Sequence, residues 1–198
     1  WLGPILVFSL IMIAYPLTVE FLQTNLEKGF YSLLWISILL SMMLATEDIF
    51  LEDFSDGSLE QTIISNASFP LLIAKKIFIY WLMIGVPISF LSFLFSLSLT
   101  QDFNLSLSIF PLSVVSSYIF LNLFVFGNAL SLNKGSVLGA IITMPLALPV
   151  LIILGKSVIA IEFGINYVEF LLLLLGILSI IITIVPFIIS YVIKAHLE

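Results

Sequence analysis

Residues 168–193 read VEFLLLLLGILSIIITIVPFIISYVI, a run with a single charged side chain, Glu169. A helix of about 20 apolar residues crosses the hydrocarbon core of a bilayer. Further apolar runs precede this one, and they are apolar on every side rather than alternating as barrel strands do. The sequence therefore predicts an all-α integral membrane protein with six transmembrane helices, near residues 2–22, 29–46, 77–99, 107–130, 136–157 and 168–193.

Composition agrees with this class. Hydrophobic residues make up 62% of the chain and charged residues 9%, against roughly 45–50% and about 25% in soluble domains. The spans follow one another closely, so residues 1–198 are interpreted as a single transmembrane domain. The chain has no cysteine, which excludes disulfides and thiolate metal sites, and no metal site is predicted.

The lysines predict the orientation of the chain, because cytoplasmic loops accumulate basic residues and acids contribute little to topology. With six spans, one side of the membrane carries Lys75, Lys76, Lys134 and Lys194, and the other carries Lys28 and Lys156. This majority places both chain ends and the segment 47–76 in the cytoplasm or an equivalent compartment.

Small residues recur at helical spacing in three of the spans, which predicts faces where a neighbouring backbone approaches closely. These faces are Gly85, Ser89, Ser92 and Ser96; Ser136, Gly139 or Ala140, Thr143 and Ala147; and Gly176, Ser179, Thr183 and Ser190. A tightly packed bundle explains them, and the alternative is that some of them meet a second copy of the chain. Asn122 and Asn128 are expected to bond across helices, and Pro145 and Pro149 are expected to disrupt the fifth span.

One stretch departs from this apolar pattern. Half of the chain's twelve acids fall between the second and third spans, namely Glu47, Asp48, Glu52, Asp53, Asp56 and Glu60. Asp56-Gly57 is typical of a turn in which glycine takes a positive φ. Ser58 and Gln61 then have the spacing of a capping box, with Ser58 as the N-cap of a short helix ending near Ser65–Asn66.

This short helix would present Leu59, Ile63 and Ile64 on one side. Its negative charge disfavours binding flat on an anionic membrane surface. The remaining interpretation is docking into a groove on a soluble partner, with Leu59 and Ile63 as apolar anchors.

The chain resembles the CcmB family, the membrane subunits of the ABC system for cytochrome c maturation (haem exporter protein B). The resemblance extends from the first span to the last. It rests on Glu52-Asp53-Phe54-x-Asp56-Gly57-Ser58-Leu59-Glu60-Gln61, Ala74-Lys75, Trp81, Gly85, Pro87, Lys134-Gly135 and Pro145-x-x-x-Pro149.

The resemblance implies a type-2 ABC permease fold in the bacterial inner membrane, or alternatively in the mitochondrial inner membrane. It implies a separate ATPase, CcmA, with CcmC and CcmD in the same assembly and the haem chaperone CcmE as an indirect partner. A coupling segment would contact the ATPase through Glu52, Asp53, Asp56, Gly57, Ser58, Leu59, Glu60, Gln61 and Ile63, and a second cytoplasmic loop would include Lys134 and Gly135.

No Gly-x-x-x-x-Gly-Lys-Ser/Thr occurs, so ATP is expected on the partner and the chain is interpreted as a subunit without catalytic residues. His196 is the only histidine, and the methionines are interpreted as helix packing rather than haem ligands. No cofactor is expected to bind directly, and no nucleic-acid partner is expected. Two functions stay open: movement of haem across the membrane, or relay of ATP-driven motion that releases the haem-loaded chaperone. A generic exporter of lipid or another small molecule is the further alternative.

Overall fold

The computed structural model describes residues 2–20, 26–47, 49–64, 68–132 and 136–197, and every secondary-structure element in them is helical. The elements are α1 (Gly3–Glu20), α2 (Leu26–Ala45), α3 (Leu51–Ser55), α4 (Ser58–Ile64), α5 (Phe69–Tyr80), the π-helical turn η1 (Trp81–Gly85), α6 (Val86–Thr100), α7 (Phe103–Leu130), α8 (Ser136–Glu162) and α9 (Val168–Leu197).

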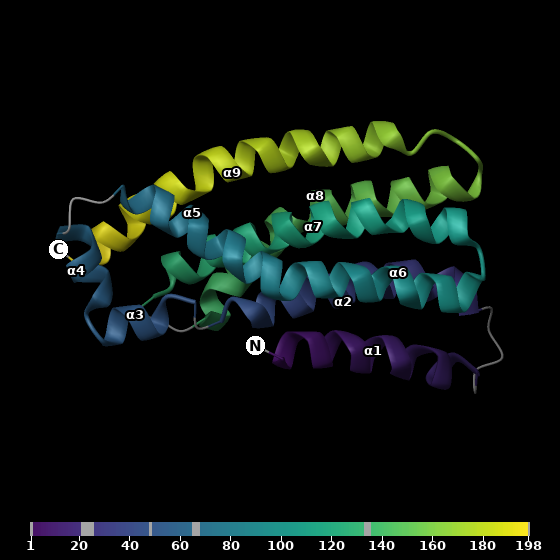
Figure 1. The fold of residues 1–198 in the computed structure, drawn as a ribbon, viewed down its shortest axis with the longest axis horizontal. Helices are drawn as coiled ribbons and strands as arrows, with labels where there is room; N and C mark the ends of the chain where they lie inside the picture. Colours follow the sequence, from purple (N-terminus) through teal and green to yellow (C-terminus); the bar gives the residue numbers. More distant parts are fainter. Residues whose placement is uncertain (1, 21–25, 48, 65–67, 133–135, 198) are drawn as a thin grey trace.

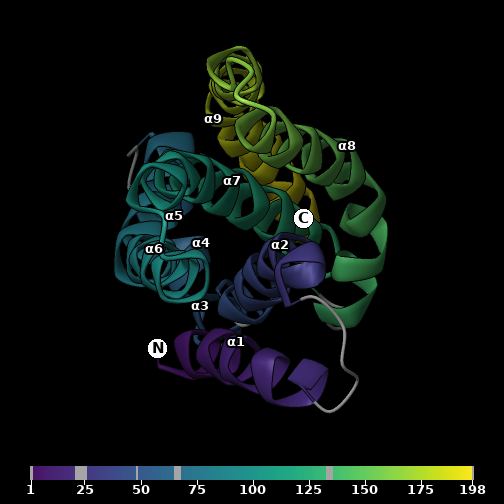
Figure 2. The same cartoon turned by 90° about the vertical axis from the view of Figure 1, so that its right-hand side faces the viewer.

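The long helices run side by side along one axis, and α3 and α4 lie together at one end of the bundle (Figure 1). The C-terminus lies at this same end, as the lysine pattern predicts. Helix α7 is central, because it packs against α2, α6, α8 and α9 (Figure 2). In its most apolar window 72% of the residues are buried, against 28% in α9.

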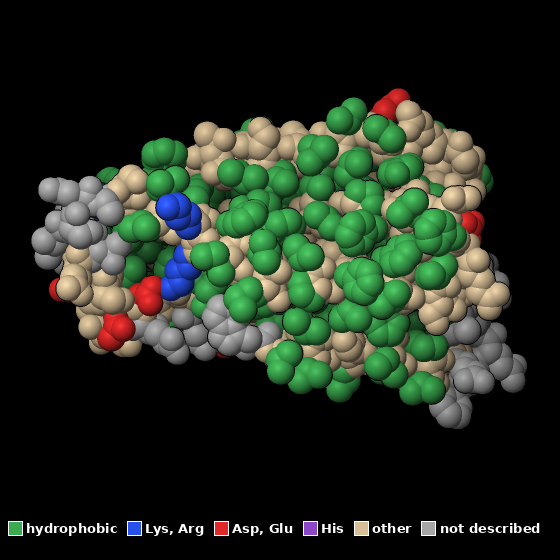
Figure 3. All heavy atoms as spheres, viewed as in Figure 1, with side chains coloured by type: hydrophobic (Ala, Val, Ile, Leu, Met, Phe, Trp, Pro, Cys, Tyr) green, Lys and Arg blue, Asp and Glu red, His purple; other side chains and the backbone are tan. Residues whose placement is uncertain are grey.

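Four helical segments are long and apolar enough to cross a membrane, by length and composition: Phe69–Thr100, Phe103–Leu130, Ile141–Glu162 and Val168–His196. Within the described residues α1 and α2 supply shorter apolar stretches, Gly3–Val19 and Gly29–Ala45. On the face shown in Figure 3, apolar side chains cover the middle, whereas charged side chains lie toward the two ends. The chain is therefore a multi-pass helical membrane protein.

The third predicted span, near 77–99, lies within a longer continuous helix. This helix begins at Phe69 and continues through η1 to Thr100, so residues 69–76 of the predicted segment 47–76 are helical. Pro70 stands in the first turn of α5, where a missing amide costs no helical hydrogen bond.

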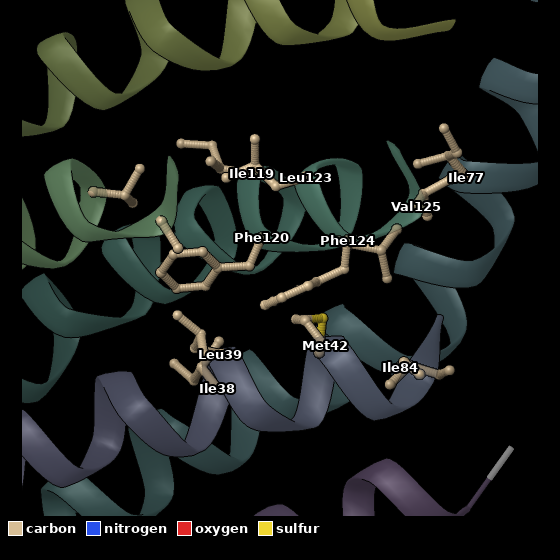
Figure 4. Close-up of a cluster of buried hydrophobic side chains, with 14 of the residues drawn as sticks. Ile38, Leu39, Met42, Ile77, Ile84, Ile119, Phe120, Leu123, Phe124 and Val125 are labelled. Atoms are coloured by element: carbon tan, nitrogen blue, oxygen red, sulfur yellow. The ribbon is translucent and has the colours of Figure 1, made fainter. Parts of the chain in front are cut away.

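The core between α2 and α7 is apolar and closely packed. Phe120 and Phe124 of α7 point toward Leu39 and Met42 of α2, and Met42 lies against Phe124 (Figure 4). Both phenylalanines and Met42 are buried. Met42 thus packs within this core.

Two of the three small-residue faces are confirmed where the structure describes them. Gly85, Ser89, Ser92 and Ser96 are buried, and so are Gly139, Thr143 and Ala147; the side chains of Ser136 and Ala140 lie outside the described part. On the third face Ser190 is buried, whereas Gly176, Ser179 and Thr183 are exposed on α9 and are not covered within the described chain. Spacing alone does not say which small residues face a neighbour.

Helices α7 and α8 approach most closely at two glycines. A Cβ atom on Gly127 would lie 2.5 Å from the carbonyl oxygen of Gly139 and 2.7 Å from Cγ2 of Thr143, and a Cβ on Gly139 would collide with the carbonyl of Gly127. Because real Cβ atoms do not approach backbone so closely, this crossing requires both glycines.

The expected break at Pro145 and Pro149 does not occur. Helix α8 continues through both prolines as a curved helix (Figure 2). The irregular turn lies instead in the preceding long segment, at Trp81–Gly85.

Candidate functional site: the α3–α4 segment

Residues immediately after α2 attach the α3–α4 segment to the helix bundle. Ile49 and Phe50 are buried, although they stand among acidic residues. The side-chain amide of Asn128, near the end of α7, donates a hydrogen bond of 2.5 Å to the carbonyl of Thr46. The predicted bond of Asn128 across helices is confirmed, whereas Asn122 donates within its own helix to Tyr118.

A second attachment joins the segment to α5. The ammonium of Lys76 forms an ion pair with the carboxylate of Asp53, and its Nζ lies 5.6 Å from the centre of the Phe50 ring. Both charged side chains are partly exposed, so the attraction is on the order of 0.2–1 kcal/mol. Asp53 is thus directed to the chain's own α5.

In the turn between α3 and α4, the backbone at Gly57 agrees with the prediction, whereas the capping at Ser58 differs from it. Gly57 has a φ of 76°, which confirms the positive φ expected from Asp56-Gly57. The capping box is wrong in detail, because α4 begins at Ser58 itself and the amide of Gln61 donates to the carbonyl of Gly57. The hydroxyl of Ser58 donates to the carbonyl of Asp53.

Asp56 performs the capping function instead. The backbone amide of Ser58 donates to Oδ1 of Asp56 at 2.9 Å, and this bond lowers the pKa of the Asp56 carboxyl below its usual value. A lowered folded-state pKa means that the stabilisation is present above the ordinary carboxyl pKa. It is lost as pH falls through the lowered pKa.

We expect Gly57→Val to loosen this turn, because a β-branched residue at positive φ costs about 1–3 kcal/mol. A Cβ at Gly57 would meet no atom within 4 Å, so the effect would come from backbone strain alone. Limited proteolysis of membranes should cut the valine variant between α2 and α5 at least about fivefold faster. Gly57→Asn is the control, since asparagine tolerates this conformation; equal cleavage of both variants would contradict the prediction.

The predicted apolar anchors do not face outward. Leu59 is 5% exposed and belongs to the core, and Ile63 is half-buried against the same core. The interpretation of Leu59 as an anchor for a partner is therefore wrong in this conformation. An amphipathic pattern shows that one face is covered, and here the chain's own helices cover it.

The outward face of the segment is mainly polar. Ser55, Asp56, Glu60 and Gln61 are exposed, and Leu51, at 49% exposure, is an apolar side chain among them. Glu52 belongs to α3, but its side chain lies outside the described part, as do Asp48, Lys134 and Gly135 altogether. The structure thus brings together Asp53, Asp56, Gly57, Ser58, Leu59, Glu60, Gln61 and Ile63 in one small unit.

The sequence did not predict the roles of three residues that hold this unit in place: Thr46, Phe50 and Lys76. One signal was available. Ile49 and Phe50 interrupt the acidic run with two large apolar residues, which is a pattern of insertion into a core.

Comparison with known proteins gives a consistent result. The family model described as "CcmB protein" matches residues 2–196. A relative named "Heme exporter protein B" from Haemophilus influenzae is 28% identical over 100% of this chain and 90% of its own length. Another of that name, from Pseudomonas aeruginosa, is 32% identical over 95% of this chain and 85% of its own. The match to nearly the whole chain shows that this protein belongs to the CcmB family.

Proposed function

We propose that this chain is the permease subunit of an ABC complex for cytochrome c biogenesis. A partner ATPase hydrolyses ATP, and the chain couples this to haem export or to release of the haem-loaded chaperone. The partners would be CcmA, CcmC and CcmD, with CcmE acting indirectly, in the bacterial inner membrane. The family membership and the relatives named heme exporter protein B support this proposal.

The proposal includes six spans in a type-2 ABC permease fold. Helices α1 and α2 have 18 and 20 residues, which corresponds to about 27–30 Å of helix, close to the thickness of the hydrocarbon core. They also lie alongside the four longer spans (Figure 1). A second copy of the chain in the complex is part of the same proposal.

One observation carries the coupling role. The α3–α4 segment presents a polar outward face beyond one end of the apolar bundle, while Leu59 and Phe50 hold its inward face in the core. A unit attached in this way transmits a push on its outer face to the helices behind it. Haem would be handled by the complex, with no ligand residue assigned on this chain.

Leu51→Asp tests where the ATPase docks. We expect this change to reduce co-purification of the ATPase without lowering membrane abundance, because Leu51 is an exposed apolar side chain on the outward face. Leu59→Asp should instead lower abundance, since it places a carboxylate in the core. Abundance and co-purified ATPase are measured together.

Ile165→Asp is the matched control. Ile165 is also exposed, in the turn between α8 and α9 at the opposite end of the bundle. Its substitution should leave ATPase binding intact. Undiminished ATPase binding by the Leu51 variant, or equal loss in both exposed variants, would contradict docking on this face.

A further inference from the structure

The longest apolar segment, Phe69–Thr100, contains a π-helical turn at Trp81–Gly85. The amide of Val86 reaches back to the carbonyl of Trp81, one residue further than in an α-helix. Pro87 follows directly; it has no amide to donate, and its ring would clash with the carbonyl four residues earlier in a regular helix. The wider turn therefore has a local cause, and such turns are common at functional bends.

The two halves of this segment have different main neighbours. Helix α5 packs mainly against α9, with a smaller contact to α7, and α6 packs mainly against α7. Figure 1 shows α5 turning away from the line of α6 at the intervening turn. The π turn thus separates two differently supported helices.

Helix α5 is also the half that is tied to the α3–α4 segment. Lys76 pairs with Asp53 of α3 and lies over the ring of Phe50. Displacement of α3 would act directly on α5, and it would reach α6 through η1.

Trp81 holds the turn against α7. Its Nε1 donates to Oγ of Ser117 at 3.1 Å, and its ring centre lies 4.8 Å from that of Tyr118. Gly85 leaves room for the indole, because a Cβ there would collide with the Trp81 ring. Oγ of Ser117 also lies 3.4 Å from Oγ of Ser89 and donates to the carbonyl of Val114. The indole is therefore part of a small buried polar cluster that joins the turn to α7.

We infer that the Trp81–Gly85 turn is a joint at which α5 swings relative to α6, and that the Trp81–Ser117 hydrogen bond holds the joint in the described conformation. The inference rests on the proposed function, since ATP hydrolysis by the partner would supply the motion. It adds to that function the place where motion of the cytoplasmic segment enters the membrane.

Spin-label distances in the purified complex test the joint. The chain has no cysteine, so introduced pairs give no background. Leu72→Cys with Leu94→Cys spans the joint, and Leu172→Cys with Ile184→Cys lies on α9 without a proline between the labels. All four positions are exposed. Labelled chain is diluted with unlabelled chain, so that each distance comes from one copy.

We expect the distance across the joint to shift between the nucleotide-free and the ATP-trapped complex, and by more than the α9 distance. Trp81→Phe should move the nucleotide-free distance toward the ATP-trapped value, because the ring stays and the hydrogen bond is lost. Trp35→Phe is the matched control: Trp35 is buried, and its Nε1 has no hydrogen-bond partner in the part of the chain that the structure describes.

Three other results would each contradict a stated part of this inference. If the ATPase co-purifies and hydrolyses ATP but the distance across the joint shifts no more than the control distance, the joint is overturned and the proposed function stands. If Trp81→Phe behaves as Trp35→Phe does, the holding role of the hydrogen bond is overturned. If no ATPase co-purifies, the proposed function is overturned and the joint with it.

Discussion

Gly127→Ala is expected to destabilise the protein by about 1–3 kcal/mol, the range for overpacking a well-packed core. The added methyl group would lie 2.5 Å from the carbonyl oxygen of Gly139, so the backbones of α7 and α8 would have to separate. Because α7 is the central helix, this separation would disturb its packing with several neighbours. The midpoint of thermal unfolding in detergent and the abundance in membranes should both fall.

Gly155→Ala is the control for this prediction. Gly155 lies in α8 as well, and a Cβ there would meet no atom within 4 Å. Alanine should therefore be neutral, or stabilising by up to about 1 kcal/mol through helix propensity. Equal unfolding midpoints for the two variants would show that the helices do not cross as described.

Asp53→Lys is expected to lower c-type cytochrome maturation severalfold, and the added change Lys76→Asp is expected to restore it. The single change places two ammonium groups where the structure has an ion pair, so attraction between α3 and α5 becomes repulsion. The double change reverses the pair and keeps the attachment. The measurement is haem-stained c-type cytochrome in membranes, divided by the amount of this chain.

The double variant separates two roles for Asp53. If the carboxylate contacts the ATPase, a lysine there would repel the partner's basic surface whatever stands at position 76. Failure of the double variant, with normal membrane abundance, would therefore assign Asp53 to the partner. Glu60→Lys should be measured in the same way, because Glu60 is a carboxylate exposed on the outward face.

The helical membrane class was predictable because it depends on the length and composition of single runs. The 168–193 run can be recognised as a span from its own sequence alone, and α9 begins at the predicted residue. The turn at Gly57 was predictable for a similar reason, since Asp-Gly encodes a local backbone conformation.

The attachments of the α3–α4 segment were not predictable in this way. An amphipathic helix indicates that Leu59 is covered, but the cover can be another protein or the same chain. The partner of Asp53 stands 23 positions away in sequence, and that of Thr46 stands 82 away. Such pairs depend on how the spans are arranged, which a single sequence does not state.

The hydrogen bond between Asn128 and Thr46 has a consequence for biogenesis. The residues that precede α3 emerge from the ribosome long before Asn128 does. Until α7 has entered the membrane, the carbonyl of Thr46 lacks this donor and α2 lacks much of its core. The attachment of the α3–α4 segment is therefore completed late in synthesis, and a truncated chain ending before α7 would lack it.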